Sequence, residues 1–335
     1  MSRMTLLAAA LSLGMTALLG LWIIPWLRRL KYGQTILDIG PKWHKNKQGT
    51  PTMGGLMFIV GVILAVTVSY TMAARLMPTL VQGHRSVLGV RLVAGLLMAL
   101  GFALIGFADD YVKVAKKRNL GLTAGQKLIV QFIVAGLYLW SLWAAGDLST
   151  VVQVPFLGQW HLGWAYWPLC AVGIVYLVNS VNLTDGLDGL ASSVTFMCAL
   201  GFLLIANLLD NLPIALLAAA VAGGCLGFLI YNAYPAKVFM GDTGSMFLGG
   251  CVVAMAFGVG LPLFLGLTGI IYLCESLSVI LQVISFKTTG KRIFKMSPIH
   301  HHFEMSGYSE VQIVSAFTAI TLVGSALAYW AVHLI

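Results

Sequence analysis

Residues 212–231 read LPIALLAAAVAGGCLGFLIY, a run of twenty positions without a charged side chain. The hydrocarbon core of a bilayer is about 30 Å thick, so a helix needs roughly 20 apolar residues to cross it. Backbone groups in lipid have no water to bond, so a run this long and apolar predicts a spanning helix. This stretch therefore indicates a helical membrane protein.

Runs of the same kind recur along the whole chain. Hydrophobic residues make up 59% of its 335 residues and charged residues 9%, whereas soluble domains carry about 25% charged residues. The first run continues into Arg28-Arg29 without a clear cleavage site, so we expect it to remain as a span. We expect an all-α polytopic membrane protein, one domain over residues 1–335, with ten spans at residues 4–27, 52–72, 91–108, 127–145, 164–179, 190–209, 212–231, 244–260, 262–286 and 311–334.

The net charge of +9 is compatible with nucleic-acid binding, but the positions of the basic residues indicate membrane topology instead. Sixteen of the twenty lysines and arginines fall on one side of the ten-span topology: Arg28, Arg29, Lys31, Lys42, Lys45, Lys47, Lys113, Lys116, Lys117, Arg118, Lys127, Lys237, Lys287, Lys291, Arg292 and Lys295. Basic residues concentrate in the cytoplasmic loops of membrane proteins. We therefore predict that this side is cytoplasmic, that both termini are external, and that nucleic acid is not a partner.

The external loop 146–163 contains two short segments, Val151–Phe156 and Trp160–Leu162, for which we predict a hairpin. The cysteines form no C-x-x-C pair, so we expect buried thiols rather than a disulfide framework or a zinc site. All five lie inside apolar runs: Cys170, Cys198, Cys225, Cys251 and Cys274.

Acidic residues are scarce, and their positions are the strongest functional signal. Five of the eleven fall in three motifs where apolar runs meet polar loops: Asp109-Asp110, Asp185-x-x-Asp188 and Asp242. Ionisable groups near lipid are costly and usually functional, and clustered carboxylates suit Mg²⁺ that holds a phosphorylated ligand. A solvated helix end, a helix cap and a glycine turn are the simpler interpretations of the three motifs. They do not explain why all three lie on the side predicted to be cytoplasmic.

Other polar residues add to this side. His300 and His301 belong to a run of three histidines, whose side chains point in different directions, so we expect phosphate hydrogen bonding rather than one shared metal ion. Lys47 precedes a Gly/Pro-rich helix entry that does not have the spacing of a Walker phosphate loop, and it is expected to steer an anionic headgroup. Glu275, inside the ninth run, is expected to hydrogen-bond within the bundle.

Taken together, the motifs resemble those of one superfamily, the polyprenyl-phosphate N-acetylhexosamine-1-phosphate transferases. Within it, the chain resembles the bacterial phospho-N-acetylmuramoyl-pentapeptide transferases, the MraY family. The matching segments occur in the family's order: Gly-Thr-Pro-Thr-Met-Gly-Gly (49–55), Ala-Asp-Asp-Tyr (108–111), Asn-Leu-Thr-Asp-Gly-Leu-Asp-Gly-Leu-Ala (182–191), Met-Gly-Asp-Thr-Gly-Ser (240–245) and Pro-Ile-His-His-His-Phe-Glu (298–304).

The resemblance implies a reaction of peptidoglycan synthesis in the bacterial inner membrane. Phospho-MurNAc-pentapeptide would pass from UDP-MurNAc-pentapeptide to undecaprenyl phosphate, giving lipid I and UMP, with Mg²⁺ required. It also implies a homodimer, a cytoplasmic active site and inhibition by nucleoside antibiotics.

The resemblance also suggests residue roles. Asp242 is the expected Mg²⁺ ligand, Asp109 the candidate base for the lipid phosphate, and Asp110 a support for metal or base geometry. The nucleoside pocket would be bordered by Asn182, Asp185, Asp188, Asn232 and Phe239, with Phe239 stacked on uracil. The phosphates or the sugar-peptide would be met by Lys47, Lys113, Lys127, His300 and His301. A covalent route through an aspartate stays open beside direct transfer.

Two other functions are compatible with parts of the pattern. A related transferase would use UDP-N-acetylglucosamine and the same lipid. A secondary transporter would use buried carboxylates, but transporters commonly show paired repeats and acids near the membrane centre. Here the acids lie at one interface and no repeat is visible, which favours an enzyme.

Overall fold

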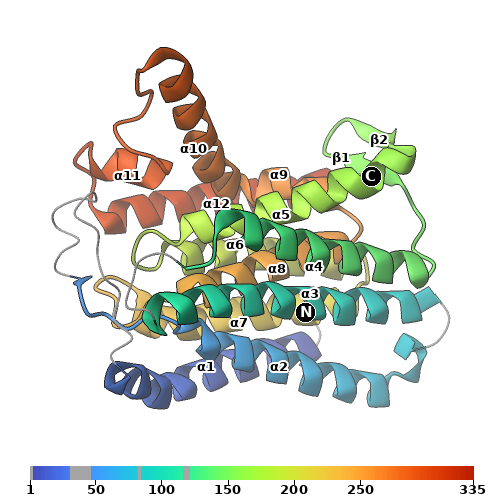
Figure 1. Ribbon diagram of the computed structural model, residues 1–335. Helices are drawn as coiled ribbons and strands as arrows, with labels where there is room; N and C mark the ends of the chain where they lie inside the picture. Colours follow the sequence, from blue (N-terminus) through green and yellow to red (C-terminus); the bar gives the residue numbers. More distant parts are fainter. Residues whose placement is uncertain (1–2, 31–46, 82–83, 116–120) are drawn as a thin grey trace.

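The computed structural model describes residues 3–30, 47–81, 84–115 and 121–335 (Figure 1). The long helices are α1 (Arg3–Arg29), α2 (Gly55–Leu76), α3 (His84–Ala115), α4 (Ala124–Ala144), α5 (Tyr166–Thr184), α6 (Leu190–Leu208), α7 (Leu212–Asn232), α8 (Gly241–Gly258), α10 (Ile270–Thr289) and α12 (Glu310–Val332). The short elements are η2 (Pro78–Val81), β1 (Val151–Val154), β2 (Gly158–His161), η3 (Gly163–Ala165), η4 (Pro262–Phe264), α9 (Leu265–Thr268) and α11 (Ile299–Glu304). Of the predicted cytoplasmic residues, Lys31, Lys42, Lys45, Lys116, Lys117 and Arg118 lie outside the described residues.

Nine helices of the described residues are long and apolar enough to cross a membrane, so this is a multi-pass membrane protein. The eighth predicted span, α8, is not among the nine because Asp242, Thr243 and Ser245 lower the hydropathy of its first turns. All of α8 from Thr243 to Gly258 is nevertheless buried, since other helices surround it.

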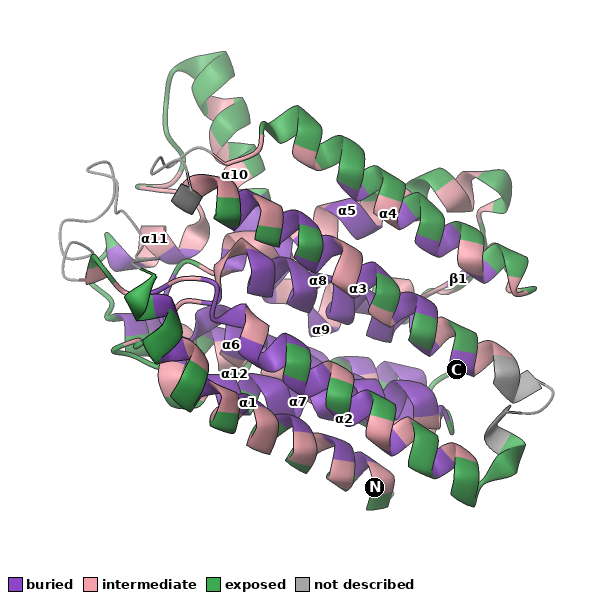
Figure 2. Ribbon diagram, turned by 60° about the horizontal axis from the view of Figure 1, so that its bottom comes forward, coloured by how far each residue is buried: buried purple, intermediate pink, exposed green. Residues whose placement is uncertain are grey.

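The ninth predicted span is wrong as a single helix. We expected one run over residues 262–286, but the chain forms η4 and α9 and breaks at Gly269 before α10 begins. Glycine is the most flexible residue and disfavours a continuous helix. A side chain at position 269 would also press on the carbonyl oxygen of Leu265. The first half of α10 packs in the bundle, whereas its second half stands away from it and is mostly exposed (Figures 1 and 2).

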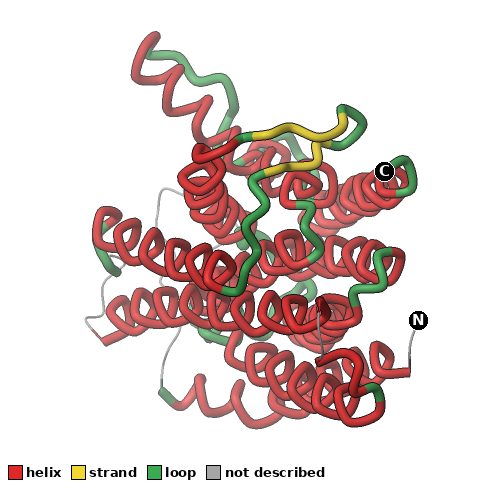
Figure 3. The backbone as a smooth tube through the Cα atoms, turned by 90° about the vertical axis from the view of Figure 1, so that its right-hand side faces the viewer, coloured by secondary structure: helices red, strands yellow, loops and turns green. Residues whose placement is uncertain are grey.

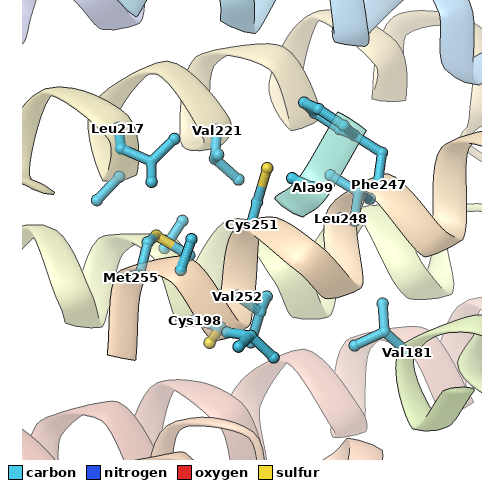
Figure 4. Close-up of a cluster of buried hydrophobic side chains, with 14 of the residues drawn as sticks. Ala99, Val181, Cys198, Leu217, Val221, Phe247, Leu248, Cys251, Val252 and Met255 are labelled. Atoms are coloured by element: carbon cyan, nitrogen blue, oxygen red, sulfur yellow. The ribbon is translucent and has the colours of Figure 1, made fainter. Parts of the chain in front are cut away.

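The core of the bundle is formed by α7 and α8, which are buried almost all round (Figure 2). Side chains of α8 such as Cys251 and Met255 interlock with Leu217 and Val221 of α7 (Figure 4). Glycines let other helices approach closely, as small residues do in membranes. A side chain at Gly250 would meet Ala99 of α3, and one at Gly223 would meet the backbone of Ala9 of α1.

The bundle has two ends with different content. At one end α1, α3, α5 and α7 finish, while α2, α4, α6, α8 and α12 begin, so the polar motifs gather there (Figure 1). At the other end lies the predicted hairpin, which is confirmed: β1 and β2 pair antiparallel with Val151 opposite His161. The C-terminus lies beside this hairpin (Figure 3).

Candidate active site

Three carboxylates from two helices meet at the polar end of the bundle. Asp109 and Asp110 come from α3 and Asp242 from α8, and one oxygen of each lies within 4.8 Å of the others. The helices can approach because α3 has Gly106 at the crossing, where a side chain would collide with the backbone of Asp242. The sequence motifs at 109–110 and 242 therefore form one site.

The local positions of these acids differ from those predicted. We expected Asp109-Asp110 to end the third span, but α3 continues to Ala115, and Lys113 one turn later pairs with Asp109 at 2.6 Å. We expected Asp242 in a loop, but it lies in the first turn of α8. The exposed amides of a helix N-terminus favour negative charge, so this position stabilises the Asp242 carboxylate.

Asp110 serves as an N-terminal cap for α8, although it belongs to α3. Its Oδ2 accepts hydrogen bonds from the backbone amide of Thr243 at 2.9 Å and from the Thr243 hydroxyl at 2.7 Å. Gly241, at φ +70°, permits this turn, because a side chain there would meet Asp110 and Thr52. This capping holds Asp242 beside the α3 pair.

Two lysines and an asparagine surround Asp242. Lys127 donates to its Oδ2 at 2.8 Å, and Lys113 lies 3.3 Å from the same atom. Asn182 donates from Nδ2 to Asp242 Oδ1 at 3.0 Å. The predicted residues Asp109, Asp110, Asp242, Lys113, Lys127 and Asn182 therefore form one contact network, in which three carboxylates face two ammonium groups.

The donor set of this cluster fits Mg²⁺. Carboxylate oxygens are the hard ligands that Mg²⁺ prefers, and Mg²⁺ usually keeps water and substrate phosphates among its six ligands. The Asp242 side chain is 21% exposed, whereas that of Asp109 is 5% exposed. Asp242 thus offers the accessible oxygens, and the buried α3 pair supports them.

The Asp185–Asp188 motif forms the loop between α5 and α6, and its two acids differ. Asp188 is buried and accepts from Lys47 at 2.7 Å and from the amide of Ala236 at 2.8 Å. Asp185 is half-buried, and burial raises its pKa to about 8, with the negative charges of Asp242, Asp110 and Asp188 adding to the shift. This shift favours the protonated form of Asp185, which can donate a hydrogen bond.

Glu310, which the sequence reasoning missed, completes a clamp on Lys47. The ammonium of Lys47 lies 2.6 Å from Glu310 and 2.7 Å from Asp188. Glu310 Oε2 also accepts from the amide of Asp188 at 3.2 Å. Burial alone would lower the pKa of Lys47, but the two carboxylates outweigh it and raise the pKa, so Lys47 stays charged. The only signal in the sequence is the Ser309-x-x-Gln312 capping box that starts α12.

Asn232 and Phe239 lie on either side of the 233–238 loop. Asn232 is buried, accepts from Gly189 and Ser192 at 3.2 Å each, and donates to the Val238 carbonyl at 3.0 Å. Its amide therefore ties this loop to the start of α6. The backbone of Phe239 pairs with Pro51 and Gly54, while its half-buried ring contacts no other aromatic ring among the described residues. The backbone of Phe239 is thus held by residues 51–54, and its side chain is partly exposed.

The three histidines turn to different partners, as predicted. His300 is buried with Nδ1 3.0 Å from Glu275 of α10, His301 Nδ1 lies 2.6 Å from Glu304, and His302 accepts from the Lys295 amide. Glu275 hydrogen-bonds inside the protein, as expected. His300 Nε2 packs on Gly186, so the histidine segment touches the Asp185–Asp188 loop.

Comparisons with known proteins agree with this arrangement. A family model described as glycosyl transferase family 4 matches residues 92–260, and a phospho-N-acetylmuramoyl-pentapeptide-transferase signature matches residues 47–59. The chain is 49% identical to the phospho-N-acetylmuramoyl-pentapeptide-transferase of Heliobacterium modesticaldum over 311 residues, 92% of each chain. It is 45% identical to the protein of that name from Halalkalibacterium halodurans over 98% of both chains, and 46% identical to one from Clostridium perfringens over 96% of this chain and 95% of the relative.

The chain belongs to the phospho-N-acetylmuramoyl-pentapeptide transferase family. Membership in the phospho-N-acetylmuramoyl-pentapeptide transferases confirms the resemblance that the motifs predicted, and it makes the chain an enzyme of the transferase class. The names of these relatives favour the muramoyl-pentapeptide reaction over an N-acetylglucosamine transferase or a transporter. The matched ranges contain Lys47, the three carboxylates and the Asp185–Asp188 loop.

Proposed function

We propose that the chain transfers phospho-MurNAc-pentapeptide from its UDP carrier to undecaprenyl phosphate, forming lipid I and releasing UMP. The observation that best supports this is the carboxylate cluster of Asp109, Asp110 and Asp242 in a chain of this family. The finer assignments below rest on the chemistry of the residues around that cluster.

The charge balance of the site explains a requirement for a divalent cation. Among the described residues, the three lysines Lys47, Lys113 and Lys127 face five carboxylates. These are the cluster of Asp109, Asp110 and Asp242 and the two partners of Lys47, Asp188 and Glu310. A UDP donor is itself anionic and would be repelled. When bound, Mg²⁺ supplies charge neutralisation of the diphosphate and of the leaving phosphate. Asp242 would hold it, with Asp109 and Asp110 alongside.

Lys113 and Lys127 are placed to meet donor phosphates. Both ammonium groups converge on one oxygen of Asp242, so a phosphate that enters beside this carboxylate lies within their reach. Charge-assisted hydrogen bonds of this kind are short and strong. The two lysines would orient the diphosphate and stabilise the charge that develops on the departing UMP.

Asp109 would meet the acceptor. It lies within the membrane-spanning part of α3, where a lipid phosphate arrives, and its oxygens accept from Lys113 and from the Leu122 amide. The second pKa of a phosphate is near 6, so most of the acceptor is already ionised at neutral pH. Asp109 would therefore position the nucleophile and take its proton mainly below that pH. Direct transfer predicts no UMP release without the lipid.

The nucleoside would lie between the Phe239 ring and the Asp185–Asp188 loop. The partly exposed ring would stack on the base, and Asp185, whose raised pKa favours the protonated form, would donate to a carbonyl of the base or to the sugar. Asn232 has its amide groups committed to backbone and to Ser192, so its role would be to position these walls.

The membrane arrangement is part of the proposal: a bacterial inner membrane, ten spans with α8 included, both termini external, a cytoplasmic site open to nucleoside antibiotics, and a homodimer. The described basic residues at the polar end support the orientation. Lys291→Cys should react with a membrane-impermeant thiol reagent in inverted vesicles and not in intact cells. Labelling in intact cells would reverse the orientation without affecting the reaction.

The proposal is tested by turnover of purified protein with undecaprenyl phosphate and either of two donors, UDP-MurNAc-pentapeptide or UDP-N-acetylglucosamine, with Mg²⁺ or with chelator. We expect lipid I and UMP from the first donor only, and only with Mg²⁺. Product from the second donor alone would assign the chain to the other branch.

A further inference from the structure

A groove lies on the membrane-facing side of α3, between α2 and α4. It encloses about 700 Å³, and its walls include Tyr70 of α2, Val93 and Leu97 of α3, and Val134 and Leu137 of α4. No charged side chain lines it among the residues that the structure describes. A hollow of this size is comparable with ligand sites, which are mostly apolar with few polar groups.

The shape of the groove follows from small residues on α3. A side chain at Gly101 would press on Val134, and one at Gly89 would press on the Tyr70 hydroxyl, so both glycines let the walls stand close to α3. From Gly89 to Gly101 the helix rises about 18 Å at 1.5 Å per residue. The groove therefore runs along the helix rather than across it, as a long flexible chain requires.

An exposed apolar stripe of α3 leads from the groove toward the end of the helix that carries the carboxylates. Leu97, Leu104 and Tyr111 are seven residues apart and share one face of the helix, and they are 63%, 68% and 53% exposed. This uncovered apolar stripe leads from the groove to the level of Asp109. The eight residues between Gly101 and Asp109 correspond to about 12 Å.

We propose that the groove holds part of the isoprenoid tail of the lipid acceptor whose phosphate meets Asp109, an assignment that rests on the proposed function. The tail lies in the bilayer when its phosphate is at the polar end, and the exposed stripe of α3 leads from the level of that phosphate to the groove. A phospholipid chain entering from the far end would bring a phosphate to Arg91, but Arg91 is already paired with Asp147 at 2.7 Å and with the Gly258 carbonyl.

The gain from this contact is modest. Lipid tails are as apolar as the groove, so an isoprenoid chain gains shape-specific packing there rather than hydrophobic transfer. The affinity for the lipid acceptor therefore depends on the length of its tail, because only a tail long enough to reach the groove packs in it.

The test uses Val93→Trp and Leu137→Trp, which fill the groove from two helices at positions 51% and 58% exposed. Val323→Trp on α12, at 59% exposed, is the matched control outside the groove. Each purified variant is assayed with undecaprenyl phosphate and with a short acceptor of two isoprene units. Thermal unfolding in detergent verifies that all variants are folded.

We expect the two groove variants to raise KM for undecaprenyl phosphate roughly fivefold, equivalent to about 1 kcal/mol, and to leave KM for the short acceptor and kcat unchanged. The control should match the unsubstituted chain with both acceptors. Equal KM values for the long acceptor in all proteins would overturn the assignment and leave the groove to phospholipid. An equal rise of KM for both acceptors would also overturn the assignment. A change of oligomeric state would overturn it too, and would show that the groove is a contact between copies. Absence of turnover in the unsubstituted chain with either acceptor would contradict the proposed function instead.

Discussion

The two ends of the bundle both hold buried or partly buried charged side chains, and they differ in how those charges are matched. At the hairpin end Arg91 pairs with Asp147 at 2.7 Å, and the Gly258 carbonyl accepts from both Arg91 and Asn211. Arg91 and Asp147 therefore match each other's charge within the protein. At the polar end, the partners of Asp109 and Asp242 among the residues that the structure describes are Lys113 and Lys127, so three carboxylates there face two ammonium groups.

This difference separates structural charge from functional charge. A buried ion pair with complete hydrogen bonding can hold helices together without a ligand, although it adds little net stability. A buried surplus of one sign is costly unless something else supplies the opposite charge. The ion pair at the hairpin end therefore has a structural role. At the polar end, the excess negative charge of the carboxylates is balanced only when a cation and substrate bind.

The largest expected effect comes from removing one negative charge from the carboxylate cluster at the polar end. Asp242→Asn removes the most accessible oxygen charge of the cluster, and kcat should fall by roughly 10²–10³, the range for losing one group that stabilises transition-state charge. Turnover measured over a Mg²⁺ series checks this. Normal turnover at limiting Mg²⁺ would show that Asp242 is not a ligand.

The next effect concerns Phe239, the residue proposed to stack on the base of the nucleoside. Phe239→Ala removes the ring, so binding of the UDP donor should weaken by about 1–3 kcal/mol, the scale of base–aromatic stacking. The KM for undecaprenyl phosphate should stay the same. Equilibrium binding of UMP measures the nucleoside contact without the lipid. A loss of affinity for the lipid alone would place the ring in the acceptor site.

A smaller effect is expected from the Lys47 clamp. Glu310→Gln keeps an acceptor for the Asp188 amide but loses the charge that faces Lys47. Donor KM should rise roughly tenfold, since a hydrogen bond to a charged group contributes about 1.5 kcal/mol. Gln312→Ala alters the same helix start without touching Lys47 and should behave as the unsubstituted chain. If both variants lose activity alike, Glu310 acts only through helix α12.

The smallest effect is on stability against pH. The folded pKa of Asp185 is raised to about 8 from an ordinary value near 4, so the folded state binds the proton more tightly between these values. The stability that this provides is complete below pH 4 and is lost as pH rises through 8. Asp185→Asn cannot ionise, so its melting temperature should gain on that of the unsubstituted chain as pH rises from 5 to 9 in chelator, by about 2–4 °C for each kcal/mol of stability that the unsubstituted chain loses. A constant difference across this range would mean that Asp185 is ionised throughout.

The spans and the membership of the site could be predicted from the sequence, whereas its internal contacts could not. Length and hydropathy are local properties, so α7 and most other helices were predicted within a few residues. The break at Gly269 depends on how the neighbouring turns pack, and glycine alone does not force it. Asp110 caps α8 from 133 positions away, and Lys47 meets Glu310 across 263 positions. No local pattern encodes such pairs, because tertiary packing brings them together.

The central claim is that the carboxylate surplus at the polar end binds a divalent cation, and the most direct measurement is Mn²⁺ binding to the purified protein by electron paramagnetic resonance. The account predicts one Mn²⁺ per chain, displaced by Mg²⁺, retained in Glu310→Gln and lost or strongly weakened in Asp242→Asn. Unchanged Mn²⁺ binding in Asp242→Asn, or no Mn²⁺ bound to the unsubstituted chain with or without UDP donor, would contradict it.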